Sequence, residues 1–257
     1  MTAHGSPRSR SVLVHFGSPT PGPRRLRLLC IAHAGAGAAP FRGWGELVPD
    51  WISVVGVRLP GRESRLREPL LTSMEDVARH IVAELEGHTG PVALFGHCFG
   101  GPVAFRVAQL LEEARTCEVV RLVTASAPVP GRVADGRLTH ELSSDELYAS
   151  LVGTGAMNDG QFGQSIFGLT ENAIRADFQA FETWTSDDFG RIEAPVLAVR
   201  GEDDRVLAEE SEDEWASFTE GGLATRSVPG GHFLLGADMP GLVDVVVRQL
   251  VDDHAGR

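Results

Sequence analysis

The chain has 257 residues, carries a formal net charge of −12 and is 42% hydrophobic. This acidic balance argues against a nucleic-acid partner or an anionic membrane surface, and no apolar run approaches the roughly 18 residues that a membrane span needs. Three widely spaced cysteines without a CxxC pair indicate free thiols and no metal site, and without a signal-peptide core they predict a cytoplasmic protein.

The N-terminal part of the chain predicts two strands and a glycine-containing loop. Residues 1–25 are rich in serine, proline, glycine and arginine, so we expect a loosely ordered lead-in with one edge strand at Val12–Phe16. Leu26–Ala32 is almost continuously apolar, as in a strand buried on both faces. It leads into residues 33–37 (HAGAG), which lack the third glycine of a dinucleotide fingerprint. We interpret this stretch as a loop that offers backbone N–H groups to an oxyanion.

An arginine-rich turn follows the next predicted strand, Ile52–Val57. Its four arginines are Arg58, Arg62, Arg65 and Arg67. They predict a solvated loop with surface ion pairs to Glu63 and Glu68. The alternative is a basic rim that binds a phosphate-bearing substrate arm.

A helix is expected between this turn and the following strand. Thr72-x-x-Glu75 has the spacing of a capping box. Apolar residues at helical spacing continue to about Glu86, so the pattern predicts one amphipathic helix.

The stretch Leu94–Phe105 joins a short apolar strand to a helix through residues 96–100 (GHCFG). This is the G-x-S-x-G pattern of a nucleophile elbow, with cysteine in place of serine. The glycines leave room for a strained strand-to-helix turn, and the helix N-terminus favours a thiolate at Cys98. Cys98 is therefore a candidate nucleophile; on the pentapeptide alone, a small buried cysteine is the alternative.

Strands and helices alternate from residue 26 to a strand at Val119–Ser126, which indicates an α/β fold with a mostly parallel, doubly wound sheet. The alternation stops at about residues 128–191, where helical patterns begin near Ser143 and near Thr170. We interpret this stretch as a lid over a pocket, and a plain packing subdomain is the alternative.

The C-terminal part returns to the sheet. Pro195–Val199 predicts a strand that ends at residues 201–204 (GEDD), at the sheet edge where open α/β folds place catalytic groups. A helix containing Trp215 and a last strand at Ala224–Val228 follow, and His232 comes directly after that strand. We find no linker long enough to mark a second domain, so we expect one domain over residues 1–257, with the lid as an insertion.

Three candidate catalytic groups each follow an apolar strand, in the order Cys98, carboxylate, His232. This is the chain order of α/β-hydrolases, and parallel strands would gather the three groups at one sheet edge. His232 takes the thiol proton or pairs with the thiolate, and a carboxylate orients the imidazole. Asp203 and Asp204 compete for that role, and the G-x-x-D spacing favours Asp204.

The neighbours of these residues have supporting roles. The backbone N–H of Phe99 and one from the loop that begins at His33 are candidate oxyanion donors. We expect His33 to shape that loop and His97 to pack beside the nucleophile, rather than to transfer protons.

As a set, these motifs resemble the type II thioesterases of polyketide and nonribosomal peptide pathways. The resemblance rests on HAGAG with FRGW, VRLPGRESR, GHCFGG, RADF, GEDD and PGGHFLL, and covers residues 26–251. It implies an α/β-hydrolase fold with a helical lid, and an acyl substrate on the phosphopantetheine arm of an acyl or peptidyl carrier protein, with no cofactor of the enzyme's own. The matching positions are the nucleophile Cys98, the acid Asp204, the base His232 and, through their backbone amides, the oxyanion donors Ala34 and Phe99.

The sequence departs from this family at two positions. Serine is usual where this chain has Cys98, and proline often follows the acid where this chain has Arg205. An acyl group on cysteine is a thioester, which passes easily to another thiol, whereas its hydrolysis by water is less assured than that of an oxygen ester.

Four functional hypotheses follow from these residues. The whole-chain match favours a thioesterase that hydrolyses acyl-carrier thioesters. The alternative is an acyl or aminoacyl transferase that uses the same cysteine to move the acyl group from one carrier to another acceptor. A small-lactone hydrolase and a non-catalytic binding module are the remaining hypotheses.

Overall fold

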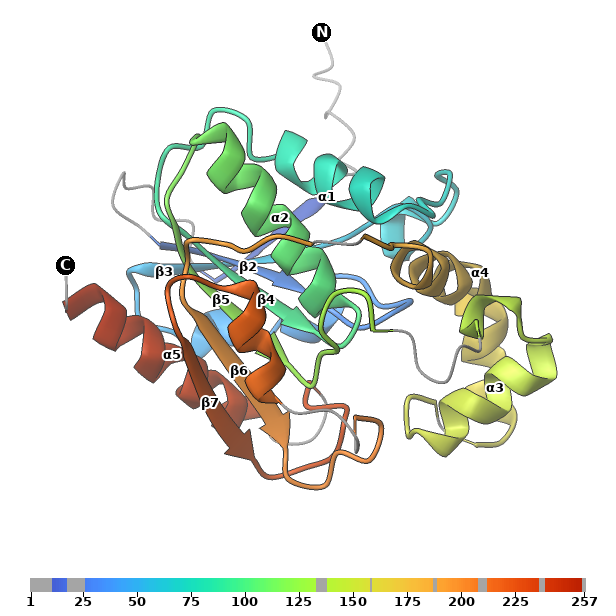
Figure 1. The fold of residues 1–257 in the computed structure, drawn as a ribbon. Helices are drawn as coiled ribbons and strands as arrows, with labels where there is room; N and C mark the ends of the chain where they lie inside the picture. Colours follow the sequence, from blue (N-terminus) through green and yellow to red (C-terminus); the bar gives the residue numbers. More distant parts are fainter. Residues whose placement is uncertain are drawn as a thin grey trace, which may run out of the picture.

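The computed structural model describes residues 11–17, 26–132, 138–157, 159–186, 189–207, 212–235 and 239–255. Within these residues, a seven-stranded sheet has helices on both faces (Figure 1). Most of the lead-in expected at residues 1–25 lies outside the described residues, but its edge strand lies within them.

The sheet has the strand order β1-β3-β2-β4-β5-β6-β7. The strand bounds are β1 Leu13–Phe16, β2 Leu26–Ile31, β3 Ile52–Val57, β4 Val92–His97, β5 Val119–Ala125, β6 Val196–Gly201 and β7 Leu223–Val228. β1 pairs antiparallel with β3, and every other pair of neighbouring strands is parallel. The predicted edge strand and the predicted parallel sheet are therefore both confirmed.

Helices cover both faces of the sheet, which explains why its central strands are mostly apolar. α1 (Met74–Ala83) and α2 (Gly100–Ala114) lie on one face, and α5 (Met239–Ala255) lies on the other (Figure 1). Successive residues of β2 alternate between the two cores: Leu29 packs in the core with α1 and α2, and Leu28 in the core with α5. The positions of β4 are all buried, so the strand that leads to Cys98 is held from both sides.

α1 begins one residue later than the sequence indicates. Its N-cap is Ser73, whose hydroxyl accepts a hydrogen bond from the Asp76 N–H at 3.5 Å. The predicted capping box of Thr72 and Glu75 is therefore wrong. Glu75 instead forms ion pairs, and its nearest partner on α2 is Arg106, at 2.8 Å.

The stretch between β5 and β6 is helical, as expected. α3 (Ser144–Gly153) begins with a capping box formed by Ser143 and Glu146. α4 (Gln161–Glu182) is longer than predicted, and Thr170 lies inside it with its hydroxyl bonded to the Ile166 carbonyl oxygen at 2.9 Å. In Figure 1 these two helices lie together at one side of the sheet, away from α5.

Two smaller observations complete the fold. The helix expected around Trp215 is a 3-10 helix, Glu212–Phe218, with the indole buried. None of the described helices is both long and apolar enough to cross a membrane.

Candidate active site

Cys98 lies in a strained turn between β4 and α2. Its backbone is in the left-handed region, with a φ of 52°, which is costly for a residue that has a side chain. The turn is tight: a Cβ on Gly96 would lie 2.1 Å from the Gly100 carbonyl oxygen, and one on Gly100 would lie 2.2 Å from the Ile31 carbonyl oxygen. This close approach explains both glycines of the motif and leaves the Cys98 side chain partly exposed in a cavity.

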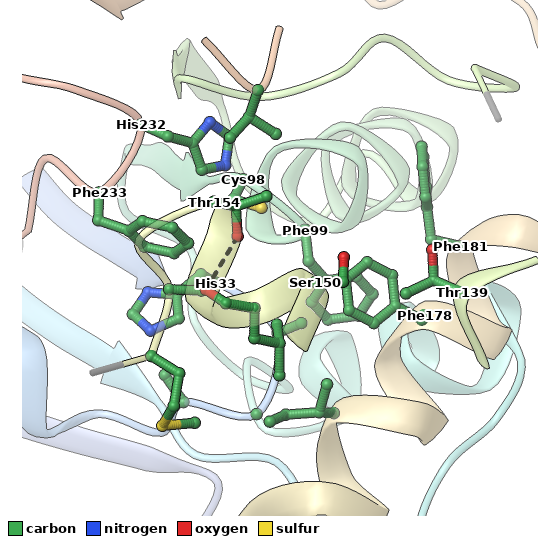
Figure 2. A pocket seen from close by; sticks show the side chains of 18 of the residues that line it. His33, Cys98, Phe99, Thr139, Ser150, Thr154, Phe178, Phe181, His232 and Phe233 are labelled. Atoms are coloured by element: carbon green, nitrogen blue, oxygen red, sulfur yellow. Dashed lines mark hydrogen bonds between the residues drawn. The ribbon is translucent and has the colours of Figure 1, made fainter. Parts of the chain in front are cut away.

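The structure brings Cys98, His232 and Asp204 together. The His232 imidazole is hydrogen-bonded to Cys98, and its Nδ1 lies 3.0 Å from Asp204 Oδ2 and 3.2 Å from Oδ1. Figure 2 shows the imidazole beside the Cys98 sulfur. Of the two carboxylates that the sequence left open, Asp204 faces the imidazole and is buried, whereas Asp203 is exposed.

Asp204 is fixed by its own turn at the end of β6. Its Oδ1 accepts hydrogen bonds from the backbone N–H groups of Val206 at 2.9 Å and Leu207 at 3.2 Å, and the Ser126 hydroxyl also bonds to it. Burial raises the pKa of this carboxyl, but the His232 hydrogen bond and charge and the other donors outweigh burial and lower the pKa to about 2. Asp204 is therefore ionised throughout the neutral range.

Opposing effects also act on His232. Burial lowers the pKa of its imidazole, but the Cys98 thiolate charge and the hydrogen bonds with Asp204 and Cys98 outweigh burial and raise the pKa to about 10. The ring is then protonated at neutral pH.

Two further histidines support the imidazole. His97 is buried, and its Nε2 lies 2.8 Å from the His232 carbonyl oxygen. The His33 ring packs edge-on against His97 and Phe233. Burial and the charge of His232 lower the pKa of His33 to about 4, so it is neutral beside the imidazolium. The sequence predicted that His33 shapes its loop and that His97 packs beside the nucleophile, but not that His97 bonds to the backbone of His232.

Ala34 and Phe99, whose backbone N–H groups are the predicted oxyanion donors, both line the cavity that contains Cys98. Within the part of the chain that the structure describes, neither group donates a hydrogen bond, although their neighbours do. The Gly35 N–H bonds to Asp177 Oδ2 at 2.8 Å, and the Cys98 N–H bonds to the Ala125 carbonyl oxygen at 3.0 Å. Ala34 and Phe99 are thus available to an oxygen atom bound beside Cys98.

The cavity has a volume of about 500 Å³ and extends from Cys98 under α3 and α4. Figure 2 shows Phe178 and Phe181 of α4 across the cavity from His232. Its apolar lining includes Leu151, Met157, Ile166, Ile174, Phe178 and Phe181. Such a lining suits an acyl chain whose carbonyl carbon lies at the sulfur.

The arginine-rich turn is only partly as the sequence indicates. Both expected ion pairs are present, Arg58 with Glu63 at 3.9 Å and Arg65 with Glu68 at 2.6 Å. Arg62 and Arg65 are buried, however, so these two side chains belong neither to a solvated loop nor to a basic rim. Arg62 forms a two-pronged pair with Asp177 of α4, at 2.7 and 3.0 Å. Sequence reasoning missed this pair because the partners are 115 residues apart, and the RADF motif was the only signal for Asp177.

The thioesterase domain family matches residues 26–250. The chain belongs to this family. This thioesterase is 32% identical over 214 residues to Thioesterase PikA5 of Streptomyces venezuelae, with 82% of this chain and 75% of that protein covered. It is 26% identical over 233 residues to the gramicidin S biosynthesis protein GrsT of Aneurinibacillus migulanus, with 88% of this chain and 89% of that protein covered.

A solved structure agrees with these relatives. The RedJ thioesterase from the prodiginine biosynthetic pathway in Streptomyces coelicolor superposes on this thioesterase with a TM-score of 0.81 and 29% identity, covering 91% of this chain and 90% of that one. The expected α/β-hydrolase fold, the resemblance to type II thioesterases and the enzyme class, a thioester hydrolase, are therefore confirmed.

Proposed function

We propose that this thioesterase hydrolyses acyl groups that carrier proteins present as phosphopantetheine thioesters in polyketide or nonribosomal peptide synthesis, using Cys98, His232 and Asp204. The observation that carries the proposal is the thiol, imidazole and carboxylate in contact at one end of an apolar cavity. The names of the relatives support the pathway, since GrsT belongs to gramicidin S biosynthesis and RedJ to the prodiginine pathway.

In the first half of the reaction, the Cys98 thiolate attacks the carbonyl carbon of the substrate thioester. The oxygen of the tetrahedral intermediate accepts hydrogen bonds from the backbone N–H groups of Ala34 and Phe99. The bond to the carrier thiol then breaks, and the His232 imidazolium gives its proton to the leaving sulfur. The products are a free carrier thiol and an acyl group bound to Cys98.

In the second half, water hydrolyses the acyl-enzyme. Neutral His232 removes a proton from the water as its oxygen attacks the acyl carbon, and the same two N–H groups stabilise the second oxyanion. Cys98 leaves as a thiolate beside the re-formed imidazolium. Asp204 keeps Nδ1 of the ring protonated and stabilises its charge in both halves. The enzyme needs no metal ion or cofactor for either step.

The carrier protein is the proposed partner, and the residues between β5 and β6 are the proposed lid of one continuous domain. The lid carries most of the apolar lining, so it holds the acyl chain, and the phosphopantetheine arm reaches Cys98 from the carrier. Removing water from the cavity strengthens the hydrogen bonds to the oxyanion.

The test follows an acyl-loaded carrier protein by intact mass. Wild-type enzyme is expected to release free acid, regenerate the carrier thiol and carry a transient acyl adduct at Cys98. Cys98→Ala is expected to abolish release, and Cys117→Ala serves as the control, since Cys117 is partly exposed and does not line the cavity. If the acyl group moves to a second carrier without free acid appearing, the enzyme is a transferase and the proposal is wrong.

A further inference from the structure

A buried ion pair joins α4 to the loop at residues 33–37. Asp177 has no exposed surface and Arg62 is 5% exposed. Arg62 Nη1 lies 2.7 Å from Asp177 Oδ2 and Arg62 Nη2 lies 3.0 Å from Oδ1, while Oδ2 also accepts the Gly35 N–H at 2.8 Å. One carboxylate of the proposed lid therefore binds the backbone of the loop beside Cys98.

The hydrogen bonds of this loop determine which N–H remains free. The His33 carbonyl oxygen accepts the Ala36 N–H at 3.1 Å. In a trans peptide the carbonyl and the following N–H point in opposite directions, so this turn directs the Ala34 N–H outward. Because Asp177 takes the Gly35 N–H, the donor left for an oxyanion is that of Ala34.

Packing also ties the loop to α4. Gly35 has a φ of 78°, and a Cβ there would lie 2.4 Å from Cγ1 of Ile174, one turn before Asp177. Arg62 holds the other side of the loop, since its Nη1 also bonds to the Ala36 carbonyl oxygen at 3.2 Å. A displacement of α4 thus moves the peptide next to the proposed oxyanion donor.

A carboxylate is needed at this position because it accepts from three N–H groups at once. An asparagine has one acceptor oxygen, and its NH₂ group would face a guanidinium or an amide that also donates. Both side chains of this ion pair are buried, so it is not a solvent-exposed surface salt bridge.

From these contacts we propose that Asp177, held by Arg62, is a positioning residue that aligns the Ala34 N–H with the oxyanion at Cys98. The proposed lid then completes the oxyanion hole through Gly35 as well as covering the acyl chain. This inference rests on the proposed function, because it requires Cys98 as nucleophile and Ala34 as oxyanion donor.

Two reactions of the same thiol separate positioning from structural damage. Acylation of Cys98 by an acyl thioester of N-acetylcysteamine builds an oxyanion, whereas alkylation by iodoacetamide displaces iodide at a saturated carbon and builds none. Asp177→Asn is expected to slow single-turnover acylation about 10- to 100-fold, part of what loss of an oxyanion donor costs. Its KM for the thioester is expected to change by less than about threefold, and its alkylation rate by less than about twofold.

The matched control is Glu171→Gln on the same helix. Glu171 pairs with Arg175 at 2.8 Å within α4 and is partly exposed. This variant loses an ion pair of α4 without touching the loop at residues 33–37, so its acylation is expected to match the wild type. If circular dichroism shows that Asp177→Asn does not fold, Arg62→Lys is the second variant, because it keeps the charge and loses the two-pronged geometry. It is expected to slow acylation by a smaller factor and to leave the alkylation rate nearly unchanged.

The outcomes distinguish two failures. If wild-type enzyme is acylated and a folded Asp177 variant is acylated equally fast, or loses acylation and alkylation in the same proportion, the inference is wrong while the proposed function stands. If Arg62→Lys is the variant that folds, the same comparison decides. If the thioester does not acylate the wild type at all, the proposed function fails and this inference fails with it.

Discussion

His97 and His232 are joined by a hydrogen bond between a side chain and the backbone, with His97 Nε2 2.8 Å from the His232 carbonyl oxygen. Burial and the nearby His33 hold the pKa of His97 well below its usual value, so the ring is neutral. A carbonyl oxygen can only accept, and Nε2 therefore carries the proton. His97, the residue before Cys98, thus anchors the backbone of the loop that carries the His232 imidazole.

We predict that His97→Leu destabilises the protein by about 1 kcal/mol, because the buried His232 carbonyl oxygen loses this donor and keeps only the Leu234 N–H at 3.1 Å. Hydrolysis should fall as well, since the loop that carries His232 loses its anchor. His97→Gln places an amide donor at a similar reach and should recover most of both losses. Urea unfolding and thioester hydrolysis measure the two effects, and equal behaviour of the two variants would show that the hydrogen bond is unimportant.

The second prediction concerns the charge on His232. Among the effects on its imidazole, burial lowers the pKa and the Cys98 thiolate is the largest opposing cause. The ring is therefore expected to stay protonated through neutral pH and to lose its proton near pH 10. Cys98→Ser removes the sulfur whose charge raises this pKa, so the imidazole pKa should fall.

The measurement is an NMR titration of the His232 Cε1–H in both proteins, assigned with a His232→Gln variant. A titration that is unchanged by the serine substitution would mean that no thiolate faces the ring. Such a result would also contradict the imidazolium–thiolate pair from which the proposed reaction starts.

The strands and the chemical residues were predictable because their signals are local. Parallel strands buried on both faces are continuous apolar runs, as in Val92–His97, where every residue is buried. The elbow glycines are required by contacts within a few residues of Cys98 and with the neighbouring strand. His232 directly follows a strand, so its place at the sheet edge followed from topology.

The parts that were missed depend on distant contacts. The first turns of α4 contain Gly163 and Gly168 and expose Phe162 and Leu169, so they have no clear apolar face. Phe167 instead packs with residues of α3, and that tertiary contact stabilises the early start of the helix. The buried pairing of Arg62 was hidden for the same reason, because no local pattern distinguishes a buried arginine from a solvated one.

The third prediction separates Asp204 from Asp203. Asp204→Asn removes the carboxylate that holds His232 and should lower kcat by at least about 100-fold, since such a substitution costs a serine protease about 10⁴. Asp203→Asn alters an exposed side chain and should leave kcat unchanged. Equal losses in the two variants would assign the wrong carboxylate to the imidazole.

The lowered pKa of Asp204 also predicts that the protein loses stability at acid pH. Its folded pKa of about 2 lies below the unfolded value of 3.8, so its contribution is complete above about pH 4 and is lost as pH falls toward 2. The shift corresponds to about 2 kcal/mol, at 1.36 kcal/mol per pKa unit. Urea unfolding at several pH values should show this loss in the wild type and a shallower one in Asp204→Asn.

The last prediction concerns the acyl chain. Leu151 of α3 is buried and lines the cavity, so Leu151→Ala should enlarge the space beyond Cys98. The ratio of kcat/KM for longer over shorter acyl thioesters should then rise, by up to about fourfold for each added methylene that the cavity buries, because each buried methylene contributes about 0.8 kcal/mol. Stability should fall by about 2–5 kcal/mol, as for other leucine truncations in a core.

Leu147→Ala is the matched control for this change. Leu147 lies on the same helix and in the same apolar cluster, but it does not border the cavity. Leu147→Ala should lower stability about as much as Leu151→Ala does, and it should leave the preference for acyl-chain length unchanged. A shift of equal size in both variants would mean that loosening of α3, and not the volume beside Leu151, changes the selectivity, and the acyl chain would then have to bind elsewhere.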